Sequence, residues 1–267
     1  MKDLLALLGR AKVYDLAQPY FIGMPHFPTH PPFLYSMTKK HGDLVSSGGV
    51  SSAADAIALG SHVGTHIDAL CHFSCGGKLH DGVKVKNIQS DAGGVGKYSV
   101  DTVAPILRRG VLLDVAGHLK QDALPTDFAV TPQHLESAAR AQKVAIGKGD
   151  VVLLRSGWAR FWNDAGRYIT GGAGNVASGP GPELEAARWL SAHGIFAAGS
   201  DTVAFEHVPA AEMPVHVHLL VESGIHIIEA LNLEELARRR VYEFVFVATP
   251  LKIRGATGSP IRPLALA

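Results

Sequence analysis

One short stretch of the chain gathers residues whose types and spacing suit a metal centre. Residues 60–73 contain His62, His66, Asp68 and His72. Two imidazoles and a carboxylate at this spacing can converge on one divalent cation and leave coordination positions open for water and substrate, as catalytic metal sites require. We therefore expect chemistry here rather than an incidental group of histidines in a polar loop, although the chain carries 14 histidines.

Two small residues between the first two histidines fit the same interpretation. Gly64 lets the backbone turn closely around a bound ion, because glycine tolerates conformations that other residues avoid. Thr65 brings a hydroxyl that can hydrogen-bond a ligand without touching the ion.

The pattern His-x-Gly-Thr-His-x-Asp, followed by a further histidine, resembles the signature of the metal-dependent cyclase/hydrolase family. That family includes bacterial kynurenine formamidases and isatin hydrolases. The resemblance implies that His62, His66 and Asp68 bind Zn²⁺ or Mn²⁺ and that His72 acts as a general base. Many members have proline where this chain has Leu70, but all four polar positions are intact.

A second group of candidate ligands follows in residues 212–236. Glu229 ends an otherwise apolar strand, where a carboxylate is costly to desolvate unless it is paired or metal-bound. The segment resembles the family pattern Pro-x-His-x-x-Leu-Leu followed by Gly-Ile-x-Ile-x-Glu, which implies that His216 and Glu229 reach the metal centre. His218 competes with His216 in register and is otherwise expected to contact substrate, whereas His226 is expected to be packed or at the surface.

The resemblance leaves the number of cations open at one or two. In two-metal members, His216, Glu229 and a bridging Asp68 would hold a second ion, whereas one Mn²⁺ or Zn²⁺ is enough in isatin hydrolase-like members. Asp201 and Glu206 lie in another segment that resembles the family, and they are expected to orient the ligands or to line the mouth of the site, with a structural role as the alternative.

Aromatic residues in two places predict the walls of a substrate pocket. Residues 18–33 are dense in proline and aromatics, so they form an extended loop rather than a helix or central strand. We expect this loop to line a pocket for a flat, apolar substrate, with Phe27 in contact with it, although a surface arm is the alternative. Trp158 follows a predicted strand, resembles the family's strand-end Gly-Trp, and is also expected to contact substrate.

Strands and helices alternate along the rest of the chain. Strands are expected over residues 13–16, 53–59, 110–115, 150–155, 195–198, 224–229 and 242–253. Helices are expected over residues 2–9, 101–109 and 182–193, and from Thr131 and Pro214 onward. This alternation predicts an α/β fold, and the absence of a linker or repeat predicts one domain over residues 1–267. The resemblance implies a swivelling β/β/α type with a central, partly closed mixed sheet.

Composition excludes several classes of protein. Hydrophobic residues make up 47% and charged residues 18%, which argues against disorder, and a net charge of +1 argues against binding to nucleic acid or an anionic membrane. No apolar run is long enough to span a bilayer, and residues 1–9 make a poor secretory signal. Cys71 and Cys75 are interpreted as free thiols, which favours a cytoplasmic location.

Together these features predict a metal-dependent hydrolase of carbon–nitrogen bonds other than peptide bonds. We expect it to open an amide bond in a small cyclic or aryl amide, as isatin hydrolase-like members do, with arylformamidase or lactone hydrolase activity as alternatives. The sequence contains no Gly-x-Ser-x-Gly motif, which argues against a serine hydrolase. The non-enzyme alternative is a protein that binds a metal or ligand without turnover. His72 argues against it, because a site that only holds a metal needs no base beside its ligands. The family resemblance also implies a homodimer or homotetramer, in which residues 19–33 could reach a neighbouring subunit.

Overall fold

A nine-stranded mixed sheet runs through the computed structural model, which describes residues 5–6, 9–172 and 174–267. The strand order is β1–β15–β13–β7–β9–β11–β12–β4–β14. The strands are β1 (Val13–Asp15), β4 (His66–Asp68), β7 (Ile106–Asp114), β9 (Val151–Arg155), β11 (Ala197–Ser200), β12 (His226–Glu229), β13 (Glu243–Ala248), β14 (Gly258–Pro260) and β15 (Leu264–Leu266). The predicted helix over residues 2–9 falls mostly outside the described residues.

The middle of the sheet is parallel and its two sides are antiparallel. β7, β9, β11 and β12 pair in parallel, and every residue of β9 and β11 is buried. Strands that are buried on both faces consist of continuous apolar residues, which is why Val151–Leu154 does not alternate between apolar and polar side chains. β4 and β13 join the two sides of this block in antiparallel pairs. The predicted α/β fold with a central mixed sheet is confirmed.

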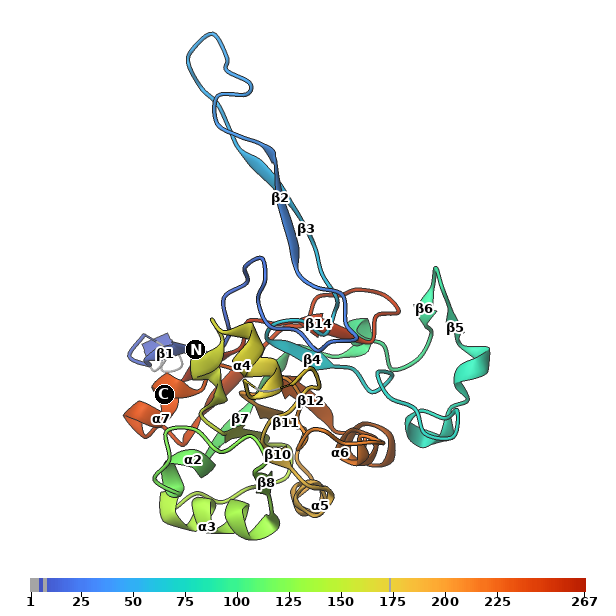
Figure 1. Ribbon diagram of the computed structural model, residues 1–267, viewed down its shortest axis with the longest axis vertical. Helices are drawn as coiled ribbons and strands as arrows, with labels where there is room; N and C mark the ends of the chain where they lie inside the picture. Colours follow the sequence, from blue (N-terminus) through green and yellow to red (C-terminus); the bar gives the residue numbers. More distant parts are fainter. Residues whose placement is uncertain (1–4, 7–8, 173) are drawn as a thin grey trace.

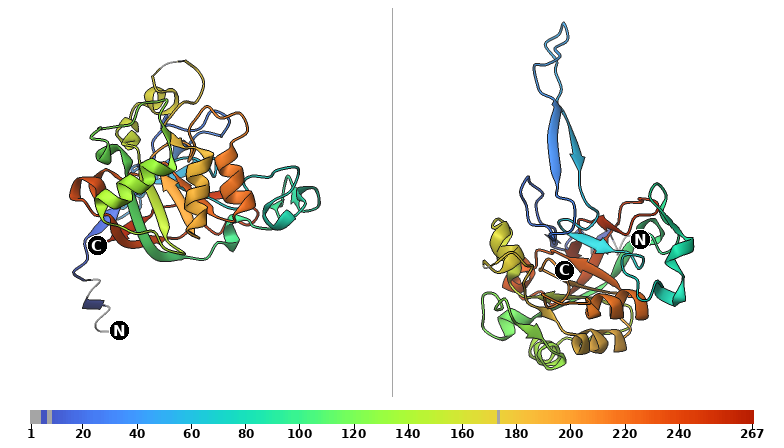
Figure 2. Two further views of the ribbon diagram at one scale, coloured as in Figure 1. Left: turned by 90° about the horizontal axis from the view of Figure 1, so that it is seen from below. Right: turned by 45° about the vertical axis from the view of Figure 1, so that its right-hand side comes forward.

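Helices cover one face of the sheet, and the curl of the sheet closes the other (Figures 1 and 2). The helices are α2 (Val115–His118), α3 (Pro132–Gln142), α4 (Ala165–Thr170), α5 (Leu184–Ala192), α6 (Pro214–His216), which continues as a π-helix over Val217–Glu222, and α7 (Glu234–Arg239). Leu135 of α3 and Leu190 of α5 pack with Val152 of β9 in the helix-covered core. Ile67 and Phe246 belong to the second core, inside the curl. No helix among these is long and apolar enough to cross a bilayer.

Helix α3 begins where its sequence predicts. Thr131 precedes the helix in an extended conformation, and its hydroxyl accepts a hydrogen bond from the amide of His134. Pro132 occupies the first helical position, where its missing N–H removes no hydrogen bond. The side chain of His134 accepts in return from the Thr131 amide, so the two residues cap the helix reciprocally.

The helix predicted over residues 101–109 is wrong. Only a single 3₁₀ turn forms there, over Val100–Thr102, and β7 begins at Ile106. Pro105 would break a helix by removing a backbone donor and clashing with the preceding turn. Residues 106–111 instead pair with the whole of β13, from Ile106 opposite Ala248 to Val111 opposite Glu243.

Three two-stranded ribbons complete the fold. β8 (Ala129–Val130) pairs with β10 (Gly181–Pro182), and β5 (Gln89–Ser90) pairs with β6 (Gly94–Val95). β2 (Leu34–Lys39) and β3 (Ala54–Ala58) form a long hairpin that projects from the body (Figures 1 and 2). The strand predicted over residues 53–59 therefore exists, but it belongs to this projecting arm and not to the central sheet. The proline-rich segment before it lies against the body, where Met24 and Phe33 are buried.

Candidate metal centre

The register of β4 against β12 assembles the centre of the site. Alternation along β4 puts His66 and Asp68 on one face and Ile67 on the other, in the core. Glu229 lies directly opposite His66 in the antiparallel pair, so its side chain shares that face. His66 Nε2 lies 3.5 Å from Asp68 Oδ1 and 3.4 Å from Glu229 Oε2. All three side chains are buried.

The turns on either side of β4 add two more imidazoles. His62 Nδ1 lies 2.7 Å from Asp68 Oδ1, and its Nε2 lies 2.8 Å from Thr257 Oγ1. His72 follows β4 in a turn closed by a hydrogen bond from its amide to the Ala69 carbonyl. The two imidazole rings stack with their centroids 3.7 Å apart. The structure thus brings together all four polar residues of the sequence motif.

Gly64 is required for a reason that differs from the sequence interpretation. Its φ is +69°, a backbone conformation that other residues adopt only with strain. A Cβ at this position would lie 2.4 Å from the ring of Tyr20. That ring packs over the turn, and its hydroxyl donates to the Val63 carbonyl. The hydroxyl of Thr65 does not face the ligands, since it donates to Ala230 O and accepts from the Gln18 amide.

Helix α6 brings His216, its last residue, to the same centre. His216 Nε2 lies 3.1 Å from Glu229 Oε1, and its Nδ1–H donates to Glu206 Oε2 at 2.8 Å. Glu206 also accepts from the backbone amides of Val215 and His216, so one buried carboxylate caps the helix and orients the imidazole. Of the two roles considered for Glu206, the contacts match orientation of a candidate ligand.

Charge is concentrated in this buried centre. Burial alone would raise the pKa of Asp68, but the imidazoles of His72 and His62 outweigh it and hold that pKa well below its ordinary value. Burial alone would lower the pKa of His216, but Glu206 and Glu229 outweigh it and raise that pKa to about 10, so a cation that binds Nε2 would displace the proton from it. Burial dominates at His72 and lowers its pKa to about 3, so this ring is neutral at neutral pH.

Two buried atoms in this cluster lack a hydrogen-bond partner among the described residues. They are His66 Nε2 and Asp68 Oδ2. The Gly64 carbonyl can only accept, so Nδ1 carries the proton in that contact, and a neutral ring would leave Nε2 bare with its lone pair available. A buried polar atom without a hydrogen-bond partner destabilises the fold, and a bound cation would provide both of these atoms with a partner. The residues therefore fit a divalent metal ion.

The donor atoms fall into two overlapping sets. His62, Asp68 and His72 form one, and His66, Asp68 and Glu229 form the other, each with its donor atoms within 4.8 Å of one another. Asp68 belongs to both sets, as a bridging carboxylate would. The first set includes His72, so the geometry also allows this residue to be a ligand.

A cavity of about 180 Å³ opens directly onto the centre. His72, His216 and Glu229 form its polar floor, while Phe27 and Phe73 form part of its wall. The ring of Phe73 packs 4.9 Å from the rings of both His72 and His216. The remaining lining residues are Thr29, His30, Val203, Ala204 and Met213.

Two residues predicted to contact substrate lie away from this cavity. His218 lies in the π-helix that follows α6, where its Nε2 is 2.8 Å from Ser191 Oγ and its Nδ1 is 2.7 Å from Glu222 Oε2. Trp158 is buried, and its indole N–H donates to the Tyr168 carbonyl. The structure therefore brings His216 and not His218 to the centre, and it gives Trp158 a packing role.

Asp201 and His226 stabilise the strands that carry the site. Asp201 is fully buried and accepts hydrogen bonds from the backbone amides of Ser156, Gly157 and Trp158, which ties the end of β11 to the end of β9. His226 Nδ1–H donates to the Asp68 carbonyl and so links β12 to β4. Of the roles considered for Asp201, these contacts match the structural one.

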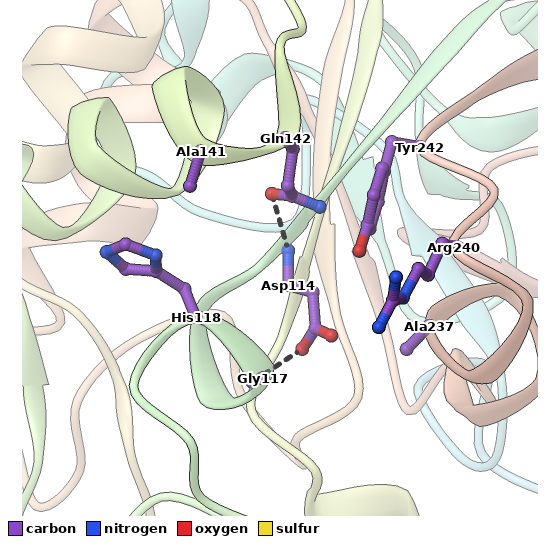
Figure 3. Close-up of a pocket in the computed structure, with 8 residues that line it drawn as sticks. All are labelled: Asp114, Gly117, His118, Ala141, Gln142, Ala237, Arg240 and Tyr242. Atoms are coloured by element: carbon purple, nitrogen blue, oxygen red, sulfur yellow. Dashed lines mark hydrogen bonds between the residues drawn. The ribbon is translucent and has the colours of Figure 1, made fainter.

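A larger cavity, of about 440 Å³, lies at the end of β7 and is separate from the metal centre (Figure 3). Asp114 accepts from the Gly117 amide and Gln142 accepts from the Asp114 amide, so both side chains serve the backbone around α2. Arg240 and Tyr242 line the opposite wall. None of the sequence-predicted ligands lies in this cavity.

Some residues of the site were not singled out from the sequence. His30 lines the cavity, and its ring lies 5.3 Å from that of His62 and 6.1 Å from that of His72. Phe73 directly follows the predicted base His72, and Met213 lies three residues before the predicted ligand His216, which is the one signal that could have identified them. His30 had a weaker signal, because it is one histidine in a proline-rich loop.

Comparison with known proteins defines the class to which this fold and site belong. The model of the putative cyclase family matches residues 14–207, and the chain belongs to this family. The isatin hydrolase of Roseibium aggregatum is 28% identical over 267 residues, which cover 97% of this chain and 93% of that protein.

Two further relatives extend the match over nearly the whole chain. A kynurenine formamidase of Bacillus cereus is 27% identical over 254 residues, which cover 93% of this chain and 94% of that protein. The crystal structure of a novel cyclase superposes with a TM-score of 0.87 at 30% identity, over 100% of this chain and 90% of that one. The family suspected from the sequence is confirmed, and the chain is a hydrolase.

Proposed function

We propose that this protein is a metal-dependent hydrolase that opens the amide bond of a small cyclic or aryl amide. The observation that carries the proposal is the pair of buried, unpartnered atoms, His66 Nε2 and Asp68 Oδ2, beside an aromatic-walled cavity. The similarity to isatin hydrolase and kynurenine formamidase, whose names describe hydrolysis of a cyclic amide and of a formamide, supports this class of bond.

Five side chains would hold one or two divalent cations, Mn²⁺ or Zn²⁺. They are His62, His66, Asp68, His216 and Glu229. A bound cation supplies a Lewis acid that activates water and polarises the substrate carbonyl. Glu206 fixes the ring of His216, and the Gly64 carbonyl fixes that of His66, so each ring presents its Nε2 to the centre.

His72 is the proposed general base. Its ring is neutral because burial lowers its pKa, and it reaches both the ligand cluster and the cavity. One of its ring nitrogens would accept a proton from the attacking water and return it to the departing amide nitrogen, which yields a carboxylate and a free amine. The stacked ring of His62 and the edge of Phe73 hold the imidazole in place.

The cavity favours a compact substrate. Its volume of about 180 Å³ is below the range of about 300–1,000 Å³ that holds drug-sized ligands. Phe27 and Phe73 would pack against a flat ring, and His30 adds a polar group to the lining. This size favours a cyclic amide such as isatin over the longer N-formylkynurenine, so arylformamidase and lactone hydrolase activity are second candidates.

Turnover of metal-loaded protein tests the proposal. Purified protein with Mn²⁺ or Zn²⁺ should hydrolyse isatin faster than N-formylkynurenine or aryl lactones, with release of the ring-opened acid followed by absorbance. Treatment with a chelator should abolish the activity, and added cation should restore it. Fully loaded protein that turns over none of these substrates would contradict the proposal and favour a protein that binds metal or ligand without turnover.

The proposed setting is a cytoplasmic homodimer or homotetramer that acts on a small molecule. Cys71 and Cys75 are not joined in a disulfide, which suits a reducing compartment. The net charge of +1 gives no basis for binding nucleic acid or an anionic membrane.

A further inference from the structure

Two polar side chains in the wall of the metal-site cavity have no role in the proposed mechanism, Thr29 and His30. Thr29 is exposed, whereas His30 is partly buried. The ring centroid of His30 lies 5.3 Å from that of His62 and 6.1 Å from that of His72. Among the described residues, His30 belongs to neither set of candidate metal donors. This position suits contact with a substrate that lies beside the cation.

Two hydrogen bonds fix the His30 ring and determine which of its nitrogens is left for a substrate. The His30 amide donates to the Phe27 carbonyl at 2.9 Å, which closes the turn that carries the ring. Nδ1 lies 3.4 Å from the carbonyl oxygen of His62, which can only accept, so Nδ1 carries the proton in that contact. In a neutral ring the other nitrogen, Nε2, is then a hydrogen-bond acceptor, and the described part of the chain offers it no donor.

An amide substrate would bring a hydrogen-bond donor into this cavity as well as an acceptor. Its carbonyl oxygen would meet the cation, but its N–H would be enclosed by the cavity wall. A buried N–H without an acceptor weakens binding, because it has lost its hydrogen bond to water. The candidate ligands and the base are already engaged, and five of the other lining residues are apolar. Nε2 of His30 is therefore the acceptor best placed for this N–H.

We propose that His30 Nε2 accepts a hydrogen bond from the amide N–H of the substrate, an inference that rests on the proposed hydrolase function. This hydrogen stays on the nitrogen throughout the reaction. Water adds its hydroxyl to the carbonyl carbon and passes its proton to His72. When the C–N bond breaks, its electron pair goes to the nitrogen, which takes that proton from His72 and leaves as an amine. His30 therefore binds and orients the substrate and transfers no proton.

The position of His30 favours a cyclic amide over an open-chain one. A small ring holds its amide cis, so that the C=O and N–H groups lie on the same edge of the substrate. An open-chain amide prefers the trans form, in which these groups point to opposite sides. His30 donates to the backbone of His62, a candidate ligand, so the acceptor and the cation site lie side by side. Only a substrate with both groups on one edge reaches both at once.

The test compares isatin with N-methylisatin, which keeps the reacting carbonyl and lacks the N–H. In His30→Asn, the shorter amide replaces Nδ1, so the donor to the His62 carbonyl is kept and the acceptor at Nε2 is lost. In His30→Gln, the longer side chain brings an amide oxygen to the position of Nε2 and restores the acceptor. His26→Asn is the control, because His26 lies in the same loop outside the cavity lining.

The assay measures kcat/KM of the metal-loaded proteins for both compounds at pH 8, where a histidine with its ordinary pKa of about 6.5 is neutral. His30→Asn should lower kcat/KM for isatin about 10–100-fold, the effect of leaving one buried donor unpaired, without lowering that for N-methylisatin. His30→Gln should recover most of the activity on isatin, and His26→Asn should match the wild type. Metal content and thermal unfolding verify that each variant is loaded and folded.

Two results would overturn the inference. If His30→Asn lowers kcat/KM equally for both compounds, His30 only supports the loop, and if it changes neither value, His30 does not contact the N–H. A wild type that turns over neither compound would contradict the proposed hydrolase function for this substrate class. Calorimetric titration of both compounds into the same metal-loaded proteins then decides on His30, since the same ratios should appear in the dissociation constants. Absence of binding, or equal loss for both compounds, would overturn the inference there too.

Discussion

Glu206→Gln should weaken metal binding without unfolding the protein. In the wild type, Glu206 Oε1 accepts from the Val215 amide and Oε2 accepts from His216 Nδ1–H. A glutamine amide keeps an oxygen acceptor for the Val215 amide, so the cap of α6 remains. Its NH₂ group then faces Nδ1 and donates to it. This places the imidazole proton on Nε2, the nitrogen that must be bare to bind a cation.

The expected loss follows from this change of tautomer. Removing the outer partner of a ligating histidine typically costs about 10–100-fold in metal affinity. Each factor of ten corresponds to about 1.4 kcal/mol, so the expected loss is about 1.4–2.8 kcal/mol of binding free energy. Glu206 is 2% exposed and His216 is 3% exposed, so little water can replace the lost hydrogen bond. We therefore expect the upper part of this range.

Calorimetric titration of Zn²⁺ or Mn²⁺ into metal-free protein measures this effect. Glu222→Gln is the matched control, because it alters a histidine–carboxylate contact of nearly the same length, 2.7 Å from His218 to Glu222, away from the centre. This control should bind metal with wild-type affinity. A Glu206→Gln protein that also binds with wild-type affinity, and melts as the wild type does, would refute the reasoning and remove His216 from the ligand set.

Three further predictions concern β4 and its flanking turns. Alanine at His62, His66 or Asp68 should remove bound metal, and elemental analysis of the purified variants is the measurement; an inactive variant with full metal content would exclude that residue as a ligand. His72→Ala should keep its metal and lose roughly 10²–10⁴ in kcat, the usual contribution of acid–base catalysis. If metal binding weakens instead and added metal restores part of the rate, His72 is a ligand. Gly64→Ala should lower the thermal unfolding temperature, because it combines a φ of +69° with a clash against Tyr20; an unchanged melting temperature would show that the turn relaxes freely.

The local sequence determined features that depend only on residues close together in the chain, such as the face of a strand or the start of a helix. Alternation along a strand places His66 and Asp68 on one face wherever that strand lies. The cap and first residue of α3, Thr131 and Pro132, specify where that helix begins. The apolar run Val151–Leu154 predicts a strand, which forms as β9. The start of α3 and this strand were predicted correctly because each rests on geometry that a few consecutive residues impose.

The tertiary structure decided what depends on distant pairing. Nothing local to Glu229 specifies that it lies opposite His66, since this depends on the register of β12 against β4. The choice of His216 over His218 depends on how α6 is rotated about its axis and on the position of Glu206 beside it. The strand that starts at Ile106 forms because it pairs with β13, which is distant in the sequence. A short stretch of sequence around Ile106 contains no information about that pairing.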